Sequence, residues 1–264
     1  MPEELAIDLM AEGIAPLIGM ESALQAVEAA AQIGAAWRAP APTEILAPLG
    51  IWSQTQMLNE QQSKIELHRA GLNIPHGAQV GVEDDLSQIL RELSPPYALK
   101  ALGIAHKSEH NAVKLNLGDE NAVRQAMTVM RDLSGTFLLE EMAPKPQAEL
   151  IVGVSRDPVV GLLMTIGAGG VLTELMSDTA ILVLPATEQD IRDALFSIRI
   201  GRLLEGYRDS DGADIEALIA NILCIANYAA LHHEELEELD VNPLFATQFG
   251  SVAVDALIVK RTKP

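Results

Sequence analysis

The chain begins with apolar residues at helical spacing and continues with runs in which apolar and polar residues alternate, as they do in β-strands. Residues 1–37 are alanine-rich and helix-like, and the segment APAPTEILAP after Arg38 has the composition of a linker, so a boundary is expected within 38–50. Next, Asn59 and Gln62 have the spacing of a capping box, and Gly71 is a stop signal. These signals predict a helix from about residue 60 to residue 70.

Strand-like and helix-like segments alternate from there to the end of the chain. Thr187 with Asp190, and Asp214, are expected to begin two of the helices. The final strands are expected to form a hairpin with a turn at Gly250. This order predicts an α+β fold with two sheet-bearing lobes and no short internal repeat. The expected strands are 78–82, 97–102, 112–117, 136–142, 148–155, 159–168, 169–176, 180–185, 240–245 and 251–259, and further helices are expected at 85–93 and 119–133.

The composition of the chain indicates which classes of binding partner are disfavoured. The 264 residues are 48% apolar, enough for a sizeable core, and 18 basic against 37 acidic residues give a formal charge of −19. Such a charge disfavours nucleic acid and anionic membranes as partners. The amino terminus has no secretory pattern, and the apolar stretch 159–172 is too short to span a bilayer, which predicts a cytoplasmic protein. The single cysteine, Cys224, lies in an apolar helical run and is expected to be a buried structural thiol.

One lysine and a following histidine loop are candidates for chemistry. Lys100 interrupts the apolar strand YALKAL, and because an unpaired ammonium is costly to bury, it is expected to face a cleft that holds an anion. An edge-strand lysine facing water is the alternative. His106 and His110 follow in IAHKSEHNAV, where a histidine can accept a phosphoryl group or act as an acid or base, although residue type alone favours an ordinary surface histidine.

The end of the chain carries an acidic set. Asp240 and Asn242 are two residues apart on an expected strand and therefore share a face, and Asp255 lies on the next expected strand. Oxygen ligands from adjacent strands suit Mg²⁺, which prefers one or two carboxylates together with substrate phosphates. An ordinary acidic hairpin remains the alternative reading of these residues.

Over about residues 59–258 the order and wording of these segments resemble the ATP-grasp domain of the NDP-forming acyl-CoA synthetases, relatives of the succinyl-CoA synthetase β subunit. The matching stretches are ALKALGIAHKSE, AVKLNL, EEMAPKPQAELIVGVSRDP, IGAGG and ELDVNPLF with AVDALI. The resemblance implies an ATP-grasp domain over 51–264 with nucleotide between two lobes, after a helical segment over 1–50 that resembles the tail of a CoA-ligase domain. The lobes are expected to be a lid of about 75–137 and a body of about 54–74 and 138–264.

The resemblance also implies roles for individual residues. Histidine 106 matches a transient phosphate carrier, and Asp240 an acidic residue that orients a phosphohistidine. The expected catalytic residues are His106, Asp240 and Arg156, and Arg156 is expected near the transferred phosphate together with the turn Gly169-Gly170. The expected nucleotide contacts are Lys100, Glu141, Met142, Glu149, Gly169 and Gly170. The expected Mg²⁺ ligands are Asn242 and Asp255.

The activity implied is the β-type half of an ADP-forming acyl-CoA synthetase, which makes acyl-CoA, ADP and phosphate from acid, CoA and ATP through phosphohistidine. Its cofactors are ATP or ADP and Mg²⁺, and its partner is a separate α-type CoA-binding subunit in a hetero-oligomer. The loop sequence HNAV replaces the family's glycine pair, which favours a branch other than acetate. A catalytically degenerate module that senses nucleotide or serves as a scaffold is the alternative, and a third hypothesis is a ligase that joins a carboxylate to an amine.

Overall fold

The computed structural model describes residues 2–38, 46, 54–103, 112–170, 178–206 and 211–262. The chain divides into two compact units, Met1–Glu44 and Ile45–Pro264. The division lies within the Pro/Ala-rich stretch that follows Arg38.

The first unit consists of two helices, α1 (Glu3–Ala11) and α2 (Met20–Ala36). Helix α2 has no buried residue, and large apolar side chains of this unit face outward, among them Met20, which is 82% exposed, and Trp37, which is 85% exposed. Two short helices of this kind have no core of their own in the described structure.

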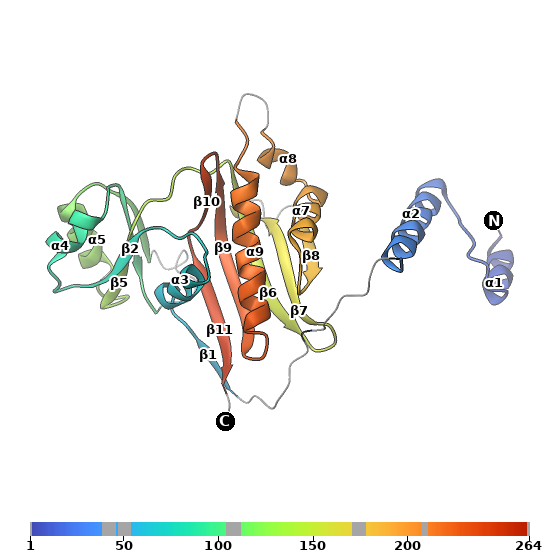
Figure 1. The fold of residues 1–264 in the computed structure, drawn as a ribbon, viewed down its shortest axis with the longest axis horizontal. Coiled ribbons are helices and arrows are strands. Elements are labelled where there is room, and N and C mark those ends of the chain that lie inside the picture. The colour runs from blue at the N-terminus through green and yellow to red at the C-terminus, as the bar shows by residue number, and fades with distance from the viewer. Residues whose placement is uncertain are drawn as a thin grey trace. The chain divides into compact units, whose positions relative to one another are not determined.

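The second unit is built on a seven-stranded sheet. Its strand order is β1-β11-β9-β6-β7-β8, with β10 also paired to β9, and every pair is antiparallel (Figure 1). Buried residues alternate along β6 with residues that are less buried, as period-2 side-chain geometry requires. Along β9 the alternation is interrupted where the register with β11 and with β6 shifts. The strands are β1 (Gln54–Met57), β6 (Ala148–Asp157), β7 (Gly161–Ala168), β8 (Thr179–Val183), β9 (Leu236–Thr247), β10 (Gly250–Ala253) and β11 (Ala256–Thr262).

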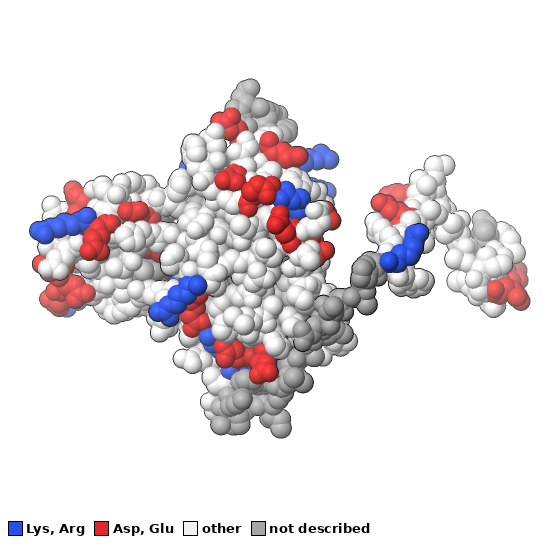
Figure 2. All heavy atoms as spheres, viewed as in Figure 1, with Lys and Arg blue, Asp and Glu red and all other residues white. Residues whose placement is uncertain are grey.

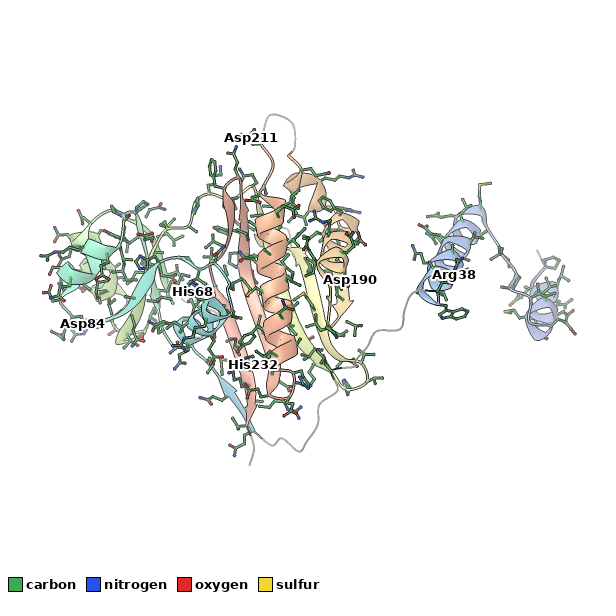
Figure 3. All side chains as sticks on the ribbon, viewed as in Figure 1. Arg38, His68, Asp84, Asp190, Asp211 and His232 are labelled. Atoms are coloured by element: carbon green, nitrogen blue, oxygen red, sulfur yellow. The ribbon has the colours of Figure 1, made fainter. Side chains whose placement is uncertain are left out.

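Helices α3 (Glu60–Arg69), α7 (Glu188–Ser197) and α9 (Ile215–Leu231) lie across one face of this sheet (Figure 1), and the short α8 (Gly201–Leu204) follows α7. The predicted starts are confirmed: Asn59 and Thr187 form capping boxes, and Asp214 accepts a hydrogen bond from the third helical N–H. Asp190, which completes one box, lies at the start of α7 in Figure 3.

A second, four-stranded antiparallel sheet has the order β2-β5-β3-β4 and its own apolar core, which includes α4 (Leu86–Glu92) and α5 (Glu120–Val129). Strand β5 pairs along its whole length within this sheet, so the sheet extends past residue 137, the expected limit of the lid. The strands are β2 (Gly77–Gly81), β3 (Tyr97–Ala101), β4 (Val113–Leu117) and β5 (Thr136–Glu141).

The carboxyl-terminal segment differs from the expected hairpin of two strands. Strand β9 pairs with β10 through its last residues and with β11 through its first residues, so the predicted strand 251–259 is two strands. Val254 and Asp255 lie in the break between them. The break interrupts the regular register, although the N–H of Val254 still donates to the Pro243 carbonyl and the Asp255 carbonyl still accepts from the N–H of Asn242. A sequence pattern of alternating apolar residues does not reveal it.

Acidic side chains are spread over the visible face of the molecule, with fewer basic ones between them (Figure 2), in line with the formal charge of −19. Of the helices in the described ranges, none has both the length and the apolar character needed to cross a membrane.

Candidate functional site

Lys100 lies on the face of the four-stranded sheet that is turned away from its core. Its neighbours Leu99 and Ala101 point into that core, and alternation along β3 places Lys100 on the other face. Its side chain is buried, and Nζ donates to the carbonyl of Val254 at 2.7 Å, in the break between β10 and β11. The lysine therefore connects the two sheets.

Lys100 is also paired with two carboxylates that the sequence did not identify. Nζ lies 2.6 Å from Glu60 Oε1 on α3 and 3.1 Å from Glu140 Oε2 on β5. Burial alone would lower the pKa of Lys100, but Glu60, Glu140 and Asp255 outweigh it and raise the pKa above its ordinary value. The ammonium is therefore charged at neutral pH and lies close to Asp255.

Asn242 and Asp255 are brought together by the same break. The backbone N–H of Asn242 donates to the carbonyl of Asp255 at 3.2 Å. Asp240 precedes Asn242 by two residues on the same strand face, opposite Gly153, where a Cβ would lie 3.6 Å from Asp240 Oδ1. Lys100, Asp240, Asn242 and Asp255 thus meet where the two sheets approach each other.

Burial, Glu238 and Asp255 raise the pKa of Asp240 to about 6. The shift arises because a desolvated carboxylate lies among other carboxylates, and a cation placed there would reverse it. Among the described residues no group of three or more His, Cys, Asp or Glu side chains forms a metal cage. Asn242 and Asp255 still supply hard oxygen donors, the set that Mg²⁺ uses when substrate phosphates complete its coordination.

Glu149 and the turn Gly169-Gly170 are also together. The N–H of Gly169 donates to the Glu149 carbonyl at 2.7 Å, and a Cβ on Gly169 would lie 3.0 Å from that carbonyl oxygen. Gly170 has φ +67°, and a Cβ there would lie 2.9 Å from Glu149 Oε2. Because both glycines allow this close approach, the turn and the glutamate form one unit. Glu149 is paired with Phe245, three residues along β9 from Asn242.

Glu141 and Met142 end β5 and begin the connection to β6. The N–H of Glu141 donates to the carbonyl of His76, and that of Met142 donates to the carbonyl of Pro96, each at 2.9 Å. Both residues line a hollow of about 420 Å³ beside the β9–β10 turn. Glu141 is paired with Tyr97, three residues from Lys100, so about 10 Å of strand separates this hollow from the ammonium.

Arg156, unlike Glu149, does not lie beside the turn Gly169-Gly170. Its guanidinium donates to the carbonyls of His233 and Leu236 at the start of β9, while Gly169 and Gly170 follow the other end of the β6–β7 pair. Roughly 20 Å of strand separates the two places. The expectation that Arg156 and the glycine turn border the same phosphate is therefore wrong, because strand pairing places them at opposite ends of β6.

Three residues of the site were missed: Glu60, Lys64 and Glu140. Glu60 and Lys64 have the i, i+4 spacing of a helical ion pair, and Glu140 interrupts the apolar run TFLLEE as Lys100 interrupts YALKAL. These signals are present in the sequence, but their convergence is shown only by the register of β3 and β5 together with the contacts that α3 makes there. His106 lies outside the described residues.

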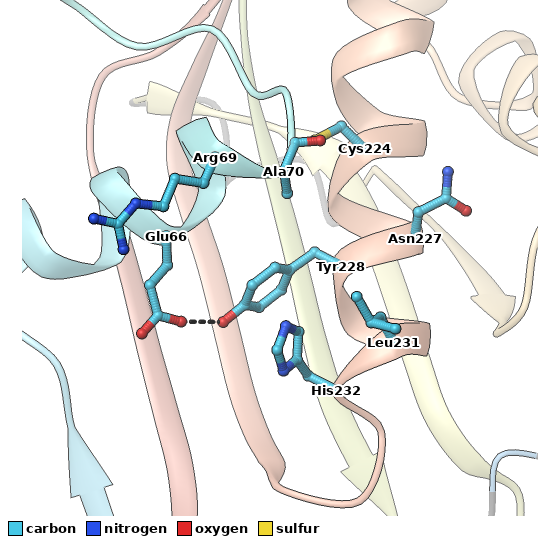
Figure 4. Close-up of a pocket in the computed structure, with 8 residues that line it drawn as sticks. All are labelled: Glu66, Arg69, Ala70, Cys224, Asn227, Tyr228, Leu231 and His232. Atoms are coloured by element: carbon cyan, nitrogen blue, oxygen red, sulfur yellow. Dashed lines mark hydrogen bonds between the residues drawn. The ribbon is translucent and has the colours of Figure 1, made fainter.

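A separate hollow of about 430 Å³ lies between α3 and α9 (Figure 4). In it the Tyr228 hydroxyl donates to Glu66 Oε2 at 2.5 Å. Burial and the neighbouring Glu66 raise the pKa of Tyr228. Cys224 borders the same hollow and is partly buried, its Sγ 3.1 Å from the Ala70 carbonyl. None of the predicted site residues within the described ranges lines this hollow.

Comparison with known proteins gives one family. The family described as "ATP-grasp domain" matches residues 51–259. Among curated relatives, the β subunit of acetate–CoA ligase [ADP-forming] I from Pyrococcus furiosus is 30% identical over 219 residues, which are 78% of this chain and 93% of the relative. A trans-feruloyl-CoA synthase from an unknown prokaryotic organism is 25% identical over 271 residues, covering 98% of this chain and 38% of the relative.

Comparison with solved structures gives the same kind of enzyme as comparison with curated sequences. The dinucleotide-forming acetyl-coenzyme A synthetase 1 of Ca. Korarchaeum cryptofilum, in complex with coenzyme A, Ca-AMPCP and HgCl⁺, superposes with a TM-score of 0.71 at 30% identity. The match covers 78% of this chain and 94% of that one.

Proposed function

Because the chain belongs to the ATP-grasp family, in the branch of the β subunits of ADP-forming acyl-CoA ligases, we propose that Lys100, Asn242 and Asp255 form its nucleotide-phosphate and Mg²⁺ site. The observation that carries this proposal is the 2.7 Å contact between Lys100 Nζ and the Val254 carbonyl, next to Asp255. It brings a charged lysine of one sheet beside the carboxylate and amide of the other.

Each group has a defined task in phosphoryl transfer. Lys100 binds a phosphate oxygen and offsets charge there, and Asn242 and Asp255 would hold Mg²⁺. When bound, Mg²⁺ supplies charge neutralisation between phosphate oxygens. Met142 and Glu141 border the base, which extends the nucleotide about 10 Å along β3 and β5, and Glu149 with its glycine turn lies near the ribose.

The first acceptor is His106 of this chain. One ring nitrogen of His106 forms a bond to the γ-phosphorus as the bond from that phosphorus to the ADP oxygen breaks, and the other ring nitrogen keeps its proton. The phosphoryl group passes in the same way from His106 to a histidine of a separate α-type, CoA-binding subunit. We infer that Asp240, a carboxylate on the same strand face as Asn242, accepts a hydrogen bond from the other ring N–H of the partner's histidine and orients that ring. The phosphoryl group then passes to the carboxylic acid, and CoA displaces phosphate from the acyl phosphate.

The helical unit Met1–Glu44 supports a partner of this kind. Its apolar side chains are exposed, and the trans-feruloyl-CoA synthase, of which this chain covers only 38%, is matched across nearly the whole of this chain. We infer that the unit contributes to contact with the CoA-ligase part of the enzyme.

The test is reconstitution of the purified chain with an α-type partner, followed by measurement of ADP and acyl-CoA formed from ATP, CoA and a panel of carboxylic acids that includes acetate and ferulate. Asp255→Asn should lower the rate at least about tenfold while the urea midpoint stays near that of the wild type, because it removes one charged metal ligand. Asn242→Ala should act in the same direction. Asp193→Asn, an exposed change on α7, is the matched control. Full activity of Asp255→Asn would contradict the site.

A second experiment tests the histidine relay. His106→Asn should leave ATP binding nearly intact and abolish acyl-CoA synthesis with the partner, since the carrier is lost while the phosphate contacts remain. Incorporation of ³²P from labelled ATP into histidine is the direct readout. Synthesis at the wild-type rate by His106→Asn would instead support direct transfer to the partner's histidine.

A further inference from the structure

Four charged side chains are buried together where the two sheets meet. Glu60 and Lys64 come from α3, Lys100 from β3 and Glu140 from β5, and each is between 2% and 4% exposed. Charged residues are rarely buried to this degree unless they are paired, and here every member has a partner of opposite charge.

The two lysines share the same two carboxylates. Lys64 Nζ lies 2.7 Å and 2.9 Å from the two carboxylate oxygens of Glu140, and 3.0 Å from Glu60 Oε1. Lys100 reaches the same Glu60 oxygen at 2.6 Å and Glu140 Oε2 at 3.1 Å. Lys100 also contacts the break between β10 and β11, through the Val254 carbonyl.

Because the two lysines share these carboxylates, binding of an anion to Lys100 affects how Glu60 and Glu140 are neutralised. A phosphate that binds the Lys100 ammonium competes with Glu60 and Glu140 for it, and withdrawal of Lys100 would leave two buried carboxylates. An uncompensated buried charge is strongly unfavourable. Lys64 contacts both carboxylates independently of Lys100, so it can keep them neutralised when Lys100 turns to a phosphate.

We propose that Lys64 is a positioning residue of the nucleotide site, which holds Glu60 and Glu140 so that Lys100 can exchange a carboxylate for a nucleotide phosphate. The inference rests on the proposed function of Lys100. It assigns to Lys64 a role in affinity for ATP, although Lys64 itself does not touch the nucleotide.

The proposal predicts effects of opposite sign for two neighbouring residues. Lys64→Met leaves the carboxylates dependent on Lys100 and removes one positive charge beside it, so the dissociation constant for Mg·ATP should rise about tenfold. Glu60→Gln removes one competitor for Lys100 and one negative charge, so the dissociation constant should fall by several fold. The double variant Glu60→Gln/Lys64→Met should return to within about threefold of the wild type.

The experiment is calorimetric titration of the full chain with Mg·ATP, alongside urea unfolding of each variant. Lys64→Arg keeps the charge and should stay close to the wild type. Lys260→Met and Glu66→Gln are matched controls, because they make the same chemical changes at a partly exposed pair on the other side of α3 and should leave ATP affinity unchanged. Should Lys64→Met fail to fold, the sign of the effect of Glu60→Gln still decides the question.

A purely structural role has a different signature. In that case both single variants would lose stability and weaken ATP binding together, and the double variant would recover neither; this result would overturn the inference while the site itself stands. If the wild-type chain does not bind Mg·ATP, the proposed function fails, and the inference fails with it.

Discussion

Two glutamates of helix α3 form ion pairs of nearly equal length with lysines on two different strands, in very different surroundings. Toward the four-stranded sheet, Glu60 lies 2.6 Å from Lys100, and the two side chains are 1% and 5% exposed. On the other side, Glu66 lies 2.7 Å from Lys260, and these side chains are 30% and 20% exposed. The distance between the charged atoms therefore does not by itself set how much an ion pair contributes to stability. At the exposed outer pair, water can solvate a charge that has lost its partner, whereas at the buried inner pair it cannot.

The largest expected effect is on activity at the inner pair. Lys100→Met should reduce acyl-CoA synthesis with the partner subunit about 100-fold or more, since it removes the cation that offsets charge on the phosphates. The fold should persist, because Lys64 still contacts both carboxylates. Rates from the reconstituted enzyme and circular dichroism of the variant measure the two effects. A Lys100→Met enzyme as active as Lys260→Met would remove the distinction between the pairs.

The next effect is on stability. Lys64→Met should lower the free energy of unfolding by about 3 kcal/mol, because it leaves two buried carboxylates to a single lysine. Lys260→Met should cost less than about 1 kcal/mol, because water and salt replace the lost partner. Urea unfolding at low and high salt measures both, and only the outer pair should respond clearly to salt. Equal losses for the two variants would show that burial does not separate the pairs.

The smallest effect is a pH dependence of the outer pair. Burial alone would raise the pKa of Glu66, but hydrogen bonds from Lys260 and Tyr228 outweigh it and lower the pKa. A lowered carboxyl pKa in the folded state adds stability above the unfolded pKa, and this stability is lost as the pH falls through the folded pKa. Because the pair is partly exposed, the loss on going from pH 6 to pH 3 should be about 0.5 kcal/mol greater for the wild type than for Glu66→Gln. Unfolding curves at both pH values give this difference, and identical pH profiles would contradict it.

The sequence predicted what local signals determine. The capping boxes at Asn59 and Thr187 depend on residues three apart, and both are present in the structure. The α+β fold and the family followed from segment order and matching stretches, which the comparisons confirm. Lys100 was singled out because a lysine in an apolar strand requires a partner.

Features that depend on tertiary pairing were not predictable in the same way. The break at Val254 and Asp255 lies inside an apolar run that reads as one continuous strand. Arg156 stands 13 positions before Gly169 in the sequence, yet the antiparallel pairing of β6 and β7 carries them to opposite ends of a strand. Likewise, Glu140 meets Lys100 only through the register of β3 and β5.

The two-residue break between β10 and β11 also limits how the chain length can vary. Both strands pair with β9, so the number of residues between them sets which side chains of β11 face the core. Deleting either Val254 or Asp255 would shift β11 by one position and turn the buried Ile258 to the opposite face of the sheet. Insertions and deletions should therefore be excluded from this point among functional homologues, whereas substitutions at Val254, which contributes its carbonyl, should be tolerated.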